Sequence, residues 1–130
     1  MHLANPAELQ TAANADREFR LAARYWSTTL DLVSSSGAVR LEIANGHVAG
    51  CRRRQSEPPA AITITGPDDG WAEFLAPVPR PFHQDLLGGC VQHHGFTVGG
   101  DILGFHAYYP ASQRLFAIMR MLHAAPTEGR

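Results

Sequence analysis

The sequence predicts a single α+β domain in which helices cover one apolar face of a mostly antiparallel sheet. Three observations point to this fold class. Apolar and polar residues alternate in short runs, most clearly over 39–43, as in strands that bury one face. Asn45-Gly46 follows that run and favours a tight hairpin turn. Segments with helical periodicity stand near both ends of the chain and would provide the cover that such a sheet needs.

The size and charge of the chain restrict its function. Its 130 residues, 45% of them hydrophobic, suffice for one domain (1–130) with a substantial core. A formal net charge of -1 disfavours nucleic acid as a partner. No apolar run is long enough to span a bilayer, and the first residues lack the pattern of a signal peptide. We therefore expect a cytoplasmic protein that does not insert into membranes.

Lysine and cysteine usage exclude further chemistries. All 11 basic residues are arginine, so the chain has neither the lysine of a phosphate-binding P-loop nor one for Schiff-base catalysis. Cys51 and Cys90 are far apart and form no paired motif, which favours reduced, structural thiols over a disulfide. We expect no cofactor and no metal site.

The first helical segment runs from Pro6 to about Trp26. Its apolar residues fall near one side of a helix, but Asp16 interrupts that side. The segment is therefore either one helix or two, the second capped near Asn14 or Asp16. Residues 1–5 are expected to be disordered.

The predicted sheet begins with four strands joined as an antiparallel meander. Leu30, Leu32 and Val33 mark the first strand, 39–43 the second, and the return strand carries Val48 inward. Ile62 and Ile64 mark the fourth, after an irregular stretch that contains Arg52-Arg53-Arg54. Those arginines suit either a solvated strand end or a docking point for an anionic group or an acidic partner.

Two helices are predicted after the fourth strand. Pro67, Asp68 and Asp69 are start signals for a short one. The second extends from about Pro81 to His94 and contains Gly88-Gly89, which weakens it by roughly 1 kcal/mol per glycine. It is predicted to be the gate through which a ligand enters.

The last third of the chain predicts a fifth strand and a final helical region. Residues 95–101 form the strand, and Asp101 can cap a helix that begins at Ile102. Pro110 interrupts or restarts that helix. An apolar stripe runs from Ala111 to Leu122, and 124–130 are expected to be disordered.

The order of these elements resembles the sterol carrier protein-2 (SCP-2) superfamily. The resemblance rests on IANGHVAG, AAITIT, DDGWAEFL and the G-x-x-x-G-G-D of 95–101, and it covers roughly Arg20 to Leu122. It implies a five-stranded sheet covered on one face by helices, with a tunnel for sterols, fatty acids or acyl chains between the two layers. Members of the superfamily generally bind and do not catalyse. The sequence is similar to a stand-alone, bacterial-type member.

Candidate ligand-binding residues are the large apolar and amphipathic side chains of the predicted covering helices. Methionine and aromatic residues together suit a pocket, because methionine adapts to varied shapes and tyrosine adds a polar tip. Each candidate is also suited to ordinary core packing. They are Trp71, Phe74, Phe82, Leu86, Phe105, Tyr108, Tyr109, Phe116 and Met119.

The leading hypothesis is a non-catalytic carrier of a hydrophobic small molecule such as a lipid, a sterol, a fatty acyl chain or a terpenoid. The first alternative is an enzyme acting on that ligand, with His83, His93 or His94 as acid or base. The second is an accessory subunit that docks on a partner enzyme through Arg52–Arg54. A homodimer is a further possibility that the sequence leaves open.

Overall fold

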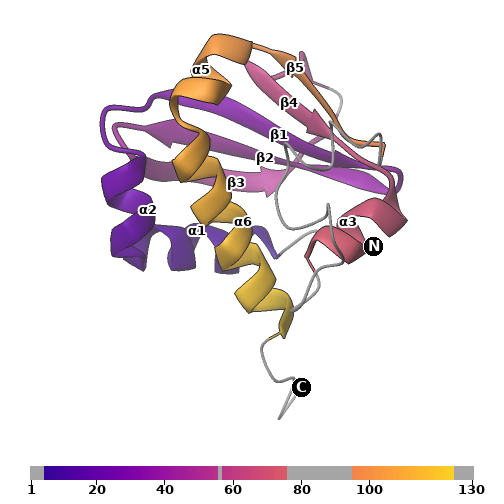
Figure 1. Ribbon diagram of the computed structural model, residues 1–130, viewed down its shortest axis with the longest axis horizontal. Coiled ribbons are helices and arrows are strands. Elements are labelled where there is room, and N and C mark those ends of the chain that lie inside the picture. Colours follow the sequence, from indigo (N-terminus) through magenta and orange to yellow (C-terminus); the bar gives the residue numbers. More distant parts are fainter. Residues whose placement is uncertain (1–4, 56, 76–94, 125–130) are drawn as a thin grey trace.

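The computed structural model describes residues 5–55, 57–75 and 95–124. They form a mixed five-stranded sheet and its covering helices (Figure 1). The elements are α1 (Pro6–Ala15), α2 (Arg17–Ala22), β1 (Thr28–Ser34), β2 (Gly37–Ala44), β3 (His47–Arg53), β4 (Ile62–Thr65), α3 (Asp68–Phe74), β5 (Thr97–Gly100), α5 (Ile102–Ala107) and α6 (Tyr109–Ala124). The predicted gating helix over 81–94 lies outside the described residues, as do most of the residues predicted to be disordered.

The sheet has the strand order β3-β2-β1-β4-β5. β1, β2 and β3 are joined by antiparallel hairpins, and β4 pairs with β5 in the same sense. Asn45 and Gly46 both have positive φ, at 50° and 79°, as a type I′ turn requires. The turn predicted from these two residues is therefore present.

The fourth strand corrects the predicted meander. β4 does not pair with β3 but lies beside β1 and runs parallel to it, with Ile62 opposite Leu30 and Ile64 opposite Leu32. The alternation of isoleucine and threonine specifies which side chains face the core. The same alternation would result whether β4 paired with β3 or with β1, so it does not predict the neighbouring strand. The chain therefore crosses from β3 to the far side of β1 through residues 54–61.

Helix starts follow the predicted capping residues. Asp16 ends α1 and caps α2, because its Oδ1 accepts the N–H of Phe19 at 2.7 Å. Asp101 caps α5 in the same way, accepting the N–H of Gly104 at 2.9 Å. Pro110 lies in the first turn of α6, where proline is tolerated. The N-terminal segment is thus two helices, and the final region restarts at α6.

The helices cover one face of the sheet (Figure 1). α1 also protects the outer strand, because the Asn14 side chain accepts the N–H of Val48 at 2.8 Å and donates to its carbonyl at 2.9 Å. The core between the sheet and the helices is apolar. Its residues include Leu9, Phe19, Leu30, Leu32, Leu41, Val48, Ile62, Ile64, Leu115 and Met119.

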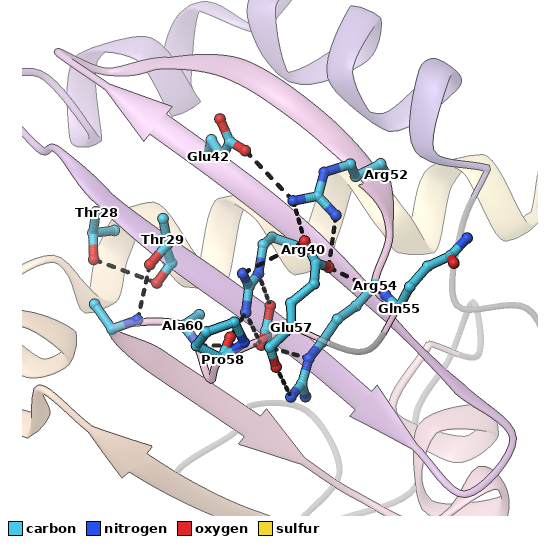
Figure 2. A network of polar contacts seen from close by, with 12 residues as sticks. Thr28, Thr29, Arg40, Glu42, Arg52, Arg54, Gln55, Glu57, Pro58 and Ala60 are labelled. Atoms are coloured by element: carbon cyan, nitrogen blue, oxygen red, sulfur yellow. Dashed lines mark hydrogen bonds and ion pairs between the residues drawn. The ribbon is translucent and has the colours of Figure 1, made fainter.

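The other face carries a polar network (Figure 2). Asp31 is completely buried there, and Arg40 donates to both its carboxylate oxygens at 2.8 and 2.9 Å. Arg54 lies 3.5 Å from the same carboxylate, and Arg52 binds Glu57 through two contacts of 2.6 and 2.7 Å. These pairs hold the 54–61 crossover against the sheet. Two of the three arginines predicted as a docking point therefore neutralise carboxylates of their own chain.

Candidate functional site

Four aromatic rings form a buried cluster on the helix-covered side of the sheet. Trp71 and Phe74 come from α3, Phe96 precedes β5, and Phe116 comes from α6. Ring centroids lie 5.0 Å apart for Trp71 and Phe96, and 5.1 Å apart for Phe74 and Phe116. Both pairs meet edge to face, a favourable geometry for aromatic rings. We call these four residues the aromatic cluster.

Local sequence accounts for the position of each ring. Trp71 and Phe74 are three residues apart, so they share one face of α3. The indole N–H of Trp71 donates to the carbonyl of Val33 at 2.9 Å, which ties α3 to the end of β1. The Phe96 ring lies against Gly66, where a Cβ atom would come within 2.5 to 3.0 Å of the ring. Glycine is required at that position because the ring occupies the space of a side chain.

Arg120 forms a polar border to the aromatic cluster. Its guanidinium lies 5.5 Å from the centroid of the Phe74 ring, and its Nε and one terminal nitrogen donate to the Phe74 carbonyl at 3.2 and 2.6 Å. Burial lowers the pKa of Arg120 below its ordinary value. The arginine satisfies a carbonyl at the end of α3 and keeps a charged group beside the rings.

A second aromatic group lies where the connection between α2 and β1 meets the junction of α5 and α6. Trp26 and Tyr108 stack with their centroids 5.0 Å apart and an angle of 9° between their planes. Phe105 and Tyr109 meet edge to face at 5.4 Å. Both tyrosines are partly buried against the core, so each combines an apolar ring with a polar tip.

Solved structures share this fold, although no protein-family model and no curated protein matches the sequence. A crystal structure of sterol carrier protein 2 superposes with a TM-score of 0.74, at 22% identity over 91% of this chain and 97% of that one. The chain has the sterol carrier protein-2 fold. The resemblance stated from the sequence is confirmed at the level of fold.

Two further structures share the SCP-2 fold. A protein of Thermus thermophilus, described as possibly a sterol carrier protein, has a TM-score of 0.72 and 22% identity, covering 99% of this chain and 95% of its own. A ubiquinone synthesis protein, UbiJ-SCP2, has a TM-score of 0.55 and 14% identity, covering 94% and 90%. These similarities establish the fold of the chain.

Within this SCP-2 fold, the predicted ligand-binding residues divide into two groups. Trp71, Phe74 and Phe116 belong to the aromatic cluster, and Phe105, Tyr108 and Tyr109 belong to the second group. Met119 is fully buried on α6. The remaining candidates lie outside the described residues. They are Phe82, Leu86, His83, His93 and His94.

Three residues of these groups were not among the sequence candidates. Phe96 lies in the predicted strand over 95–101, and Trp26 ends the predicted first helical segment. Arg120 belongs to the predicted last helix, where it lies one turn after Phe116 and so shares a face with it. That spacing was the available signal.

The aromatic cluster consists of apolar rings, and Arg120 places an ionisable group against one of them. Across residues 5–55, 57–75 and 95–124, no three His, Cys, Asp or Glu side chains gather as metal ligands would. None of the described helices is both long and apolar enough to cross a bilayer. The arrangement is suited to contact with apolar molecules.

Proposed function

We propose that the protein binds and carries a hydrophobic small molecule between its sheet and its helices. The observation that carries the proposal is the aromatic cluster. It joins α3, the start of β5 and α6 within a fold shared with sterol carrier protein 2. Its four rings come from three separate segments of the chain, so distant parts of the sequence meet there.

The ligand classes proposed are lipids, sterols, fatty acyl chains and terpenoid-like molecules. Aromatic rings and Met119 provide apolar contacts that tolerate varied shapes. Tyr108 and Tyr109 would orient a polar end of the ligand. Because one structural neighbour is described as a ubiquinone synthesis protein, molecules with isoprenoid tails belong among the probes.

The proposed contact residues are the described members of the predicted set, together with Phe82 and Leu86 as predictions from the sequence. Phe96 is added because it completes the aromatic cluster. Each of these side chains also contributes to the core. Binding therefore has to be tested with variants that separate ligand contact from packing.

Binding can be measured through the protein's own fluorescence. The chain has two tryptophans, so Trp26→Phe leaves Trp71 of the aromatic cluster as the sole reporter. This variant is titrated with dehydroergosterol, a dansyl-labelled fatty acid and a fluorescent isoprenoid. Saturable energy transfer from Trp71 to at least one probe is expected. A folded protein that transfers energy to none of them would contradict the proposal.

A matched pair of variants on α6 tests the contact residues. Met119 and Ile118 are neighbours and both are buried, but only Met119 is a proposed contact. Replacing either by alanine should cost about 2–5 kcal/mol of unfolding free energy. Met119→Ala should also weaken probe binding, whereas Ile118→Ala should not. Equal binding by the two variants would remove Met119 from the site.

A further inference from the structure

A concave surface lies between α2 and the turn that joins β2 to β3. It is an open depression of about 450 Å³, within the range of small-molecule sites. One wall carries Arg17, Arg20, Leu21 and Arg24, and the other is formed by 45–47. The depression shares no residue with the aromatic cluster, so it is a separate site.

The arginines of this depression lie on one side of α2 and the turn that follows it. Positions 17, 20, 21 and 24 are spaced i, i+3, i+4 and i+7, which places them along a single helical face. All three arginines are exposed, and none forms an ion pair or side-chain hydrogen bond with another described residue. The guanidinium carbon of Arg24 lies 5.8 Å from the centroid of the Tyr25 ring.

The acidic residues closest to them in sequence are already engaged. Asp16 accepts two hydrogen bonds from Arg114, at 3.0 and 2.7 Å. Glu18 lies 3.5 Å from the same guanidinium. Asp16 and Glu18 thus contact Arg114, and none of the three arginines of the depression has a carboxylate partner among the described residues.

The opposite wall is held in place without a ligand. The N–H of Gly46 donates to the carbonyl of Trp26 at 3.1 Å, and the N–H of Asn45 donates to the Ser27 hydroxyl at 3.0 Å. A Cβ atom on Gly46 would lie 3.0 Å from the Cα of Arg24, so the turn packs directly against the chain that follows α2. The turn that forms this wall is thus preorganised.

We propose that this depression binds a small molecule that carries phosphate. Guanidinium groups donate paired hydrogen bonds to phosphate oxygens, and three that lack carboxylate partners line one concavity. Ala15 and Leu21 add an apolar surface for the rest of the molecule. The concave shape favours a soluble organic phosphate over a flat membrane surface. Arg52 and Arg54, in contrast, are paired within the chain.

Titration calorimetry with pyrophosphate and with ADP tests this site in the full chain at low salt. Saturable binding of at least one is expected. Arg20→Ser with Arg24→Ser should weaken it about tenfold or more, because charge-assisted hydrogen bonds are lost. Arg52→Ser with Arg53→Ser removes the same formal charge elsewhere and should leave binding within about twofold. All four arginines are exposed, and circular dichroism verifies that both double variants fold, including the one that loses the Arg52–Glu57 pair.

Three results would overturn the proposal. The first is the absence of saturable binding to either probe, and the second is equal weakening by the two double variants. The third is binding confined to phosphatidylglycerol vesicles, which would identify the arginines as a membrane-contact surface. The probes and residues of this test differ from those of the aromatic cluster. A failure of phosphate binding therefore leaves the proposed carrier function intact, and a failure of the carrier function leaves the phosphate site intact.

Discussion

Arg114 and Asp16 lie 98 residues apart in the sequence and form a bidentate ion pair. Nε of Arg114 is 3.0 Å from Oδ1 of Asp16, and its terminal nitrogen is 2.7 Å from Oδ2. The same carboxylate caps α2. One side chain therefore joins α6 to the junction of α1 and α2.

Replacing Asp16 separates its two roles. Asp16→Asn keeps a capping side chain but loses the charge, so the free energy of unfolding should fall by about 1–2 kcal/mol. Asp16→Ala loses both roles and should cost about 2–4 kcal/mol. Urea unfolding measures both changes. Glu18→Gln is the control, because Glu18 is exposed and its change should stay within about 0.5 kcal/mol. An Asp16→Asn variant as stable as this control would contradict the role of the ion pair.

Acid should destabilise the fold through two carboxylates. The hydrogen bond from Arg52 lowers the pKa of Glu57 from 4.5 to about 2, and that from Arg114 lowers the pKa of Asp16. Both groups release their protons more readily when folded, so their stabilisation is complete above their unfolded pKa values. For Glu57 it is lost as the pH falls from 4.5 towards 2.

The pH dependence can be measured by urea unfolding at pH 7, 5, 4 and 3. The unfolding free energy should decrease below pH 5, and the decrease should be smaller in Glu57→Gln. In an NMR titration, the chemical shift of the Glu57 carboxyl carbon should still be that of the ionised carboxylate at about pH 3. An ordinary titration of Glu57 near pH 4.5 would show that the pair with Arg52 does not persist in solution.

Asp31 should be one of the most sensitive positions in the chain. Its carboxylate is fully buried against Arg40, and removing one partner of a buried pair costs about 3–5 kcal/mol. Asp31→Leu should therefore destabilise strongly in chemical unfolding. Combining it with Arg40→Met should recover part of the loss, because the guanidinium that donates to both Asp31 oxygens is then removed as well. The recovery is partial because Arg54, 3.5 Å from Asp31, still loses that contact. A double variant as unstable as the sum of the two single variants would contradict this account.

Gly46 and Gly37 provide a matched pair of glycine substitutions. Gly46 has a φ of 79° and packs against the backbone of Ala23 and Arg24, so Gly46→Ala should cost about 1–3 kcal/mol. Gly37 has open space around its Cα, so Gly37→Ala should be neutral or should stabilise by up to about 1 kcal/mol. Thermal unfolding compares them. Similar midpoints for the two variants would mean that the turn is not held against α2.

Cys51 should be slow to react in the folded protein. It is half-buried, and burial raises the pKa of its thiol from 9.0 to about 11. In a Cys90→Ser background, the reaction with a disulfide reagent at pH 7.5 should be about a hundredfold slower than after unfolding, because less thiolate is present. A cysteine placed at the exposed position Ala49, with Cys51→Ser, should react rapidly. Fast reaction of Cys51 without unfolding would contradict its burial.

Local features of the fold could be predicted from the sequence. The hairpin at Asn45-Gly46, the caps at Asp16 and Asp101 and the inward positions of Leu30 and Leu32 all follow from interactions within a few residues. The order of such signals also sufficed for the resemblance to the SCP-2 fold. These features depend on backbone preferences that a short segment already has by itself.

The tertiary structure decided which distant segments meet. β4 lies beside β1 because of the 54–61 crossover, and Arg52 and Arg54 meet carboxylates on that path. The aromatic cluster combines rings from three segments. The arginines of α2 form one side of a depression only because the β2–β3 turn packs beside them. Periodicity specifies the face on which a residue lies but not the partner of that face, since the partner depends on how the whole chain packs.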